Sequence, residues 1–206
     1  GNLEFSLSIN SSTVMLTGEV IMPDLASFLL YMAFDGISRH DILDGSLLQK
    51  LGGKLFIQLV EFMRSPIKKA LEASSHFTPP ESIYEIARAA SRHVSLGNMA
   101  GEGWLLTGEM ASLMEKGIRN VVCLQPWACL PNHIMGKGMF REIRRWYEDA
   151  NLVAMDCDAG ASEVNQLNRL KLMLSVARDK CPEGKILGTQ EHVEAVPVGV
   201  PAGGQA

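Results

Sequence analysis

The sequence predicts an α/β fold: a parallel Rossmann-like sheet flanked by helices, with a helical insertion. Two short apolar runs, 120–124 and 152–155, have the length and the β-branched content of buried strands, and turn residues follow each of them. A helical pattern lies between them, over about 133–147, and strands that alternate with helices indicate parallel pairing with right-handed crossovers. We therefore expect a single α/β domain over 1–180, with the helical insertion at 36–100.

The first elements are predicted to be strands followed by a helix. Residues 3–9 alternate between apolar and polar side chains, which is the period of a half-buried strand, and residues 13–22 continue as a second β-rich stretch. Pro23 and Asp24 end this stretch and cap a helix. The apolar face of that helix is expected to consist of Leu25, Phe28, Leu29 and Met32.

The predicted insertion is helical with several breaks. Four glycines between residues 35 and 53 favour a loop with one short helix. The apolar residues from Phe56 to Leu71 then follow helical spacing, and Pro66 is expected to break or kink this run into two helices. The run Thr78-Pro79-Pro80-Glu81 has the form of a capping box and predicts a helix that buries Ile83, Ile86, Ala87, Ala90 and Val94.

The last third continues the alternation of helices and strands. A helix over about 102–116 is expected to end at Gly117, before the first buried strand. After the second buried strand, Ser162 is expected to cap a helix that carries Leu167, Leu170, Leu174 and Ala177. Residues 181–206 are rich in Pro, Gly, Val and Ala without a period, so we expect a disordered tail.

Cys129 is the strongest candidate for a functional residue. It follows the predicted strand 120–124 in a loop bracketed by Pro126 and Pro131, and open α/β sheets bind ligands outside the carboxyl ends of their strands. The two prolines restrict the shape of the loop, which suits a metal ligand or a nucleophile. The alternative is a packed thiol that acts as a small hydrophobe, and this is what we expect of Cys123.

The remaining cysteines and the charge exclude several classes of function. Cys157 and Cys181 have no neighbours at metal-ligand spacing, and four cysteines in 206 residues are too few for a disulfide scaffold. With no signal peptide or long apolar span, we expect a cytoplasmic protein without a membrane segment. The net charge is −4, with 20% charged residues, so no broad basic surface is available for nucleic acid.

Several runs of sequence together are similar to one known family. They are Gly103 to Met110 (GWLLTGEM), Gln125 to His133 (QPWACLPNH) and Gly160 to Arg169 (GASEVNQLNR), extended by Met22 to Leu25 and Ser95 to Asn98. These runs resemble the C-terminal part of the large acyl-CoA dehydratase activase-related proteins of anaerobic bacteria. The resemblance spans roughly residues 20–175, and its runs occur in the order of the family.

The resemblance implies a fragment of a larger polypeptide that joins ATPase-type activator domains to a region similar to the 2-hydroxyacyl-CoA dehydratase subunits. In that region three cysteines from three separate segments hold one 4Fe-4S cluster between Rossmann-like domains. Cys129 matches the last of the three, and the other two would lie upstream of this chain. The chain would then be one lobe of an iron-sulfur electron-transfer module. As an isolated fragment it would not be catalytic and would not carry the cluster. Its partners would be the rest of the polypeptide and an acyl-CoA.

Other residues near the same predicted sheet edge have weaker assignments. Arg169 could orient a CoA phosphate or the cluster loop, and His133 is expected to start a helix or to donate a hydrogen bond to a cluster sulfur. A Cys/His nucleophile is disfavoured, because no third group that would orient the histidine is evident. The alternative function is a structural or protein-docking domain without a cluster. An unpaired sheet edge would also favour self-association, with residues 3–9 adding to this sheet or to that of a neighbouring chain.

Overall fold

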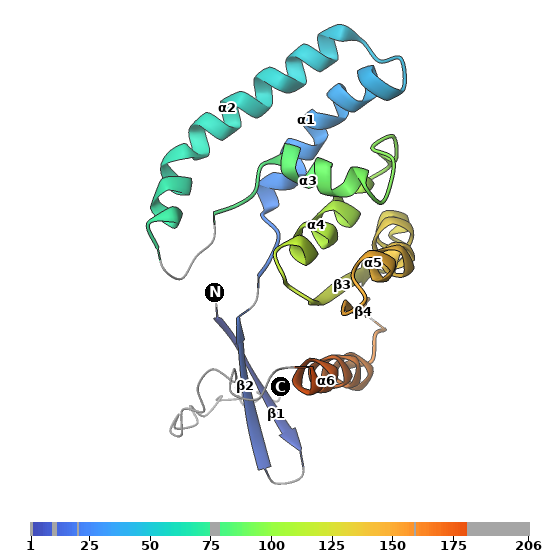
Figure 1. The fold of residues 1–206 in the computed structure, drawn as a ribbon. Coiled ribbons are helices and arrows are strands. Elements are labelled where there is room, and N and C mark those ends of the chain that lie inside the picture. Colours follow the sequence, from blue (N-terminus) through green and yellow to red (C-terminus); the bar gives the residue numbers. More distant parts are fainter. Residues whose placement is uncertain (1, 10–11, 20, 75–78, 159, 181–206) are drawn as a thin grey trace, which may run out of the picture.

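The computed structural model describes residues 2–9, 12–19, 21–74, 79–158 and 160–180. The described part is a mostly helical α/β structure that contains a small parallel sheet of two strands (Figure 1). Its elements, in chain order, are β1 (Asn2–Ile9), β2 (Ser12–Glu19), α1 (Leu25–Ile42), α2 (Leu47–Glu72), α3 (Ile83–Ser91), α4 (Trp104–Glu115), β3 (Asn120–Pro126), the π-helical turn η1 (Asn132–Gly136), the 3₁₀ turn η2 (Lys137–Met139), α5 (Phe140–Trp146), β4 (Asn151–Cys157) and α6 (Glu163–Asp179). None of the described helices is long and apolar enough to cross a bilayer.

The strands form two separate sheets. β3 and β4 pair in parallel, from Asn120 opposite Asn151 to Pro126 opposite Cys157, so the prediction of parallel pairing is confirmed. The strands are less buried than predicted, since only Val121 and Gln125 of β3 and Leu152 and Ala154 of β4 are buried. The described residues show no Rossmann sheet, because β1 and β2 pair only with each other, antiparallel. Two residues separate β1 from β2 in the sequence, and such a connection permits a hairpin, whereas parallel strands need a crossover of about a dozen residues or more. Residues 3–9 therefore form a strand as predicted, but within the described residues this strand pairs with β2 and does not join the parallel sheet, while its addition to a neighbouring chain stays a prediction.

α1 and α2 form an antiparallel helical hairpin in place of the predicted loop and broken helices (Figure 1). Asp24 caps α1 as expected, since its Oδ1 accepts a hydrogen bond from the backbone N–H of Ala26. α2 continues through Pro66 without a break in its helical assignment. An ion pair between Lys68 Nζ and Glu61 Oε2, at 2.5 Å, joins the turns on either side of this proline.

α1 buries a different face from the one predicted. Its buried apolar side chains are Leu30, Tyr31, Phe34 and Ile37, whereas Leu25, Phe28, Leu29 and Met32 are exposed. Both faces are apolar in sequence, so periodicity alone could not distinguish them. The buried face carries the two aromatic rings that pack edge-on against Trp104, which explains why it is the one turned inward.

α3 and α4 agree closely with the sequence prediction. The predicted residues Ile83, Ile86, Ala87 and Ala90 are buried, and Val94 packs against the same cluster. The capping box was predicted one turn too early: its members are Ser82 and Glu85, each of which bonds the backbone N–H of the other. Thr78 lies outside the described residues.

The segment predicted as one helix over 133–147 is divided into η1, η2 and α5. Gly136 explains the first division, because it lets the chain pass close to β3: a Cβ atom there would lie 2.8 Å from Cys123 Sγ. The last helix, α6, is confirmed, with Ser162 at its N-cap position but without a side-chain capping hydrogen bond. The predicted tail at 181–206 lies outside the described residues.

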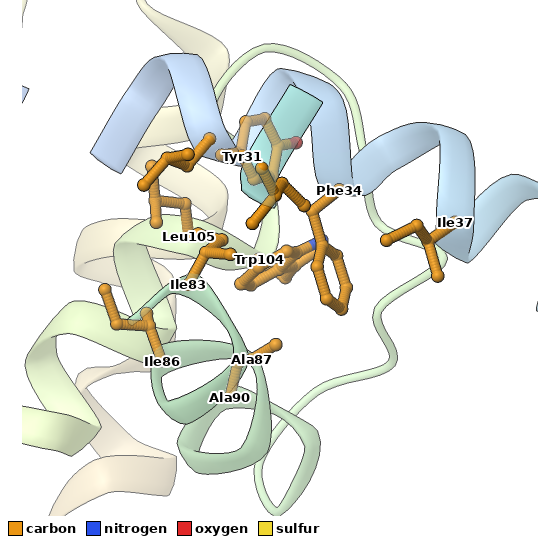
Figure 2. Packing of buried hydrophobic residues seen from close by; sticks show 11 residues of the cluster. Tyr31, Phe34, Ile37, Ile83, Ile86, Ala87, Ala90, Trp104 and Leu105 are labelled. Atoms are coloured by element: carbon orange, nitrogen blue, oxygen red, sulfur yellow. The ribbon is translucent and has the colours of Figure 1, made fainter. Parts of the chain in front are cut away.

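The buried core consists of two clusters that meet along α4. Figure 2 shows the first, in which Trp104 lies among Tyr31, Phe34 and Ile83 at the junction of α1, α3 and α4. The second cluster joins Met110 and Met114 of α4 to Ile143 of α5 and Leu152 of β4. α4 therefore connects the helical hairpin to the parallel sheet.

Two adjacent glycines in α2 provide a test of the hairpin packing. A Cβ atom on Gly53 would overlap the carbonyl oxygen of Ala33 in α1, whereas a Cβ on Gly52 would meet no atom within 4 Å. We expect Gly53→Ala to lower the free energy of unfolding by about 1–3 kcal/mol through overpacking. Gly52→Ala should raise it by about 0.5–1 kcal/mol, because alanine is the better helix former. Urea unfolding of both variants checks this, and equal effects would contradict the close contact between α1 and α2.

Candidate functional site

The Cys129 loop begins at the carboxyl end of β3 and is stabilised by its own backbone. The N–H of Cys129 donates to the carbonyl of Pro126 at 3.1 Å, and the N–H of His133 donates to the carbonyl of Cys129 at 3.2 Å. Between these bonds Ala128 has a φ of 56°, a left-handed conformation that is costly for a residue with a Cβ. Strained residues of this kind gather at functional sites. The loop therefore has a defined shape that positions one thiol.

Asn132, and not His133, contacts the sulfur. Asn132 Nδ2 donates to Cys129 Sγ at 3.0 Å, while His133 Nδ1 donates to the backbone carbonyl of Cys129 at 2.8 Å. His133 thus supports the loop backbone. The hydrogen bond to the sulfur that we expected from His133 comes from Asn132, the residue before it. The π-helical turn that starts at Asn132 sets this orientation, and π-helical turns are frequent at functional sites. The only sequence signal for Asn132 is an amide three residues after the cysteine.

Two contacts from outside the loop support it. Gly101, in the turn before α4, lies directly against the ring of Pro131, so that a Cβ at this position would overlap the proline. Thr107 of α4 is fully buried, and its hydroxyl donates to the carbonyl of Met135 at 2.7 Å. Gly101 and Gly103 therefore permit close packing beside the cysteine loop and at the start of α4. The loop is attached to the most buried helix of the structure.

Cys123 and Cys157 lie in less favourable positions for a ligand. The sulfur of Cys123 accepts a hydrogen bond from Gln125 Nε2 at 3.1 Å and lies against Gly136. Burial raises the pKa of the Cys123 thiol, which disfavours the thiolate that a metal would need. Cys157 ends β4 and directs its thiol to the Met155 carbonyl at 3.6 Å. All three described cysteines are free and partly buried.

Arg169 connects α6 to the end of β4. Its guanidinium donates to the carbonyl of Ala154 at 2.6 Å and pairs with Asp156 at 3.1 Å, and Gln166 Nε2 donates to the carbonyl of Asp156 at 2.7 Å. These partners occupy Arg169 with the backbone of the strand. The structure thus places Arg169 at the same sheet edge as Cys129, but its bonds go to β4 and not to the cysteine loop.

The described residues contain no group of three or more His, Cys, Asp or Glu side chains that could hold a metal ion. Exposed apolar side chains surround Cys129 in the chain: Trp127 is 80% exposed, and Leu130 and Ile134 are also exposed. These three side chains lie within five residues of Cys129 in the sequence and leave apolar surface open to solvent.

A second feature is a cavity of about 650 Å³ between the segment 21–27, the segment 79–81 and α4. Glu109 of α4 contributes to its lining, as do Glu81 and Lys116, which form an ion pair at 2.9 Å. Burial, with smaller contributions from the carboxylates of Asp24 and Glu81, raises the pKa of Glu109 to about 7. No sequence pattern marks this carboxyl group, because a single glutamate in a helix is ordinarily solvated.

Comparison with protein families, with curated proteins and with solved structures finds no match for this chain. The geometry of the residues therefore carries the argument about function.

The raised pKa of Glu109 predicts a pH-dependent stability. The folded state holds a proton on Glu109 up to about pH 7, whereas an unfolded glutamate loses it near its ordinary value, so stability should fall as the pH rises through this window. Glu109→Gln should remove that fall and raise the free energy of unfolding at pH 8 by about 2 kcal/mol, with little effect near pH 4.

Urea unfolding of both proteins across this pH range gives a difference curve that isolates Glu109 from other acids. One of these is Asp35, for which burial raises the pKa to about 6. A variant that is less stable than the parent at pH 8 would show that the charged form of Glu109 is stabilised by the cavity.

Proposed function

We propose that this chain is one lobe of an iron-sulfur electron-transfer module in an acyl-CoA dehydratase activase-related protein, which serves 2-hydroxyacyl-CoA dehydratase-type chemistry. The observation that carries the proposal is the geometry of Cys129: one free thiol, on a stiff loop at a strand end, bordered by exposed apolar side chains. The resemblance of the surrounding sequence supplies the chemical class. The chain is not proposed to be an enzyme alone.

The residues around Cys129 fit a thiolate ligand of a 4Fe-4S cluster. Clusters are held by cysteine thiolates, and hydrogen bonds to their sulfurs tune the reduction potential. Asn132 Nδ2 already donates to Cys129 Sγ, His133 holds the carbonyl of Cys129, and Thr107 holds the carbonyl of Met135 in the turn that follows. Bound there, the cluster would supply single electrons for reductive radical chemistry. The residues of this chain would hold one sulfur in place and cover one side of the site.

The apolar rim supports a site shared between lobes. Trp127, Leu130 and Ile134 would be covered when a second lobe closes over Cys129, and this would exclude water from the cluster. Exclusion of solvent matters because burial is one of the factors that set the potential of an iron-sulfur centre. A lobe that contributes one ligand and an apolar surface needs no metal site of its own.

Arg169 enters the proposal as a positioning residue. Its guanidinium is shared between the Ala154 carbonyl and the Asp156 carboxylate, so a CoA phosphate would have to compete with Asp156 for it. Arg169 therefore acts by fixing the carboxyl end of β4, the strand next to the one that leads into the cysteine loop. An acyl-CoA partner remains part of the proposal through the chemistry that the resemblance implies.

A docking domain without a cluster is the second candidate, and the extensive exposed apolar surface of α1 and α2 favours it. In that case the contact between Asn132 and Cys129 would serve only local packing. The two proposals differ in whether loss of the thiol changes iron content, so one experiment separates them.

The test compares two cysteine variants in the longer polypeptide that the resemblance implies, purified without oxygen. Cys129→Ala should abolish most of the bound iron and the cluster absorbance while circular dichroism shows an intact fold, because a small side chain on a loop contributes little packing. Cys123→Ala is the matched control. It should retain iron and lose about 1 kcal/mol of stability through a small void beside Gly136.

Iron and sulfide quantitation together with thermal melts decide the matter. Equal iron loss in both variants, or none in either, would show that Cys129 has no special role. The docking domain without a cluster would then be the better account of the function. A stoichiometric cluster bound by this 206-residue chain alone would contradict the shared site, because one suitable thiol cannot replace three.

A further inference from the structure

The outer face of α2 is a continuous apolar surface. It consists of Leu48, Leu51, Leu55, Leu59, Phe62 and Met63, all more than half exposed, and Phe62 is 79% exposed. These positions recur at intervals of three and four residues, so they share one side of the helix over about 22 Å of its length. Gly52 and Pro66 also fall on this side, and no charged residue interrupts it between 48 and 67.

Most of the cations of α2 are neutralised within the chain. Lys50 pairs with Asp41, Arg64 with Asp24, and Lys68 with Glu61, whereas Lys54 and Lys69 form no ion pair with another described residue. An amphipathic helix that binds an anionic lipid surface is rich in unpaired lysines and arginines beside its apolar face. With three of its five cations paired, α2 is expected to bind an apolar protein surface.

The apolar surface extends onto α1. Leu25, Leu29 and Met32 recur at helical spacing on the side of α1 that the core does not use, and all three are more than half exposed. α1 and α2 lie side by side and antiparallel (Figure 1), so the hairpin forms a two-helix layer whose core side meets α3 and α4. Two such layers packed face to face make a four-helix bundle.

The area of this surface suits a stable dimer. A standard protein interface covers about 800 Å² on each partner, and one fully exposed aromatic side chain alone contributes about 150–250 Å². Six large apolar side chains on α2 and three on α1, each more than half exposed, reach that area without any contribution from polar residues.

We propose that the outer face of α2 binds the same face of a second copy of this chain, with the two α2 helices antiparallel about a twofold axis near Ile57. In this register Leu55 of one copy faces Leu59 of the other, and Leu51 faces Met63. Gly52, which has no atom within 4 Å of its Cβ position, faces Phe62. Every large side chain thus meets an apolar or small partner, as a self-complementary interface requires. This inference does not rest on the proposed function.

The test measures the mass of the 206-residue chain in solution by sedimentation equilibrium. We expect a dimer of the 22.5 kDa chain at micromolar concentration. Leu55→Glu should weaken dimerisation more than about tenfold, because it places a charge in the centre of the interface. Leu172→Glu is the matched control: Leu172 of α6 and Leu55 are both 68% exposed, but Leu172 lies outside the outer face of α2. The control should remain a dimer.

Phe62→Glu is a second disruptive variant, and circular dichroism checks that each variant keeps its helices. A monomeric parent chain would overturn the proposal. So would a dimer that survives both Leu55→Glu and Phe62→Glu, which would point to pairing through another surface such as the β1–β2 hairpin. Flotation of a monomeric chain with vesicles of phosphatidylglycerol and phosphatidylcholine would assign the face to a lipid surface in place of a second copy.

Discussion

The structure depends on the burial of α4 between the helical hairpin and the parallel sheet. Trp104, at the start of α4, is completely buried among residues of α1 and α3, and Met114, near its end, is completely buried beside β4 and α5. Gly108 lets α3 approach closely, since a Cβ there would lie 2.8 Å from a methyl group of Ile86. Thr107 of the same helix holds the backbone at Met135. One helix thus stabilises both cores and positions the turn that follows the cysteine loop.

This arrangement separates two functional surfaces. The cysteine loop is attached to α4 through Pro131 and Met135, so its shape should be as stable as the core itself. The hairpin of α1 and α2 contacts the core with one face and leaves the opposite face to a partner. Association through the hairpin would therefore leave the Cys129 surface free for the lobe that completes the proposed site.

The sequence correctly predicted those elements that one strong local pattern marks. It missed the features that depend on contacts between distant residues. The strands β3 and β4 and the buried face of α3 followed from periodicity and composition. The face of α1 could not be predicted, because aromatic packing on Trp104 decided between two apolar stripes. Of the predicted Rossmann-like sheet the described residues show two parallel strands, and its extent could not be predicted because pairing partners are not encoded locally. At the candidate site, the position of Cys129 after a strand was predicted, but its contact with Asn132 arises from a π-helical turn that no sequence pattern marks.

The central claim is that Cys129 supplies one ligand to a cluster whose other ligands come from other segments. Diffraction at the iron absorption edge, from crystals of the longer polypeptide grown without oxygen, tests this most directly. The account predicts an anomalous peak within bonding distance of Cys129 Sγ, at the carboxyl end of β3 and against the rim formed by Trp127, Leu130 and Ile134. An iron peak whose cysteine ligands all lie in other segments, with Cys129 Sγ still bonded only to Asn132, would contradict it.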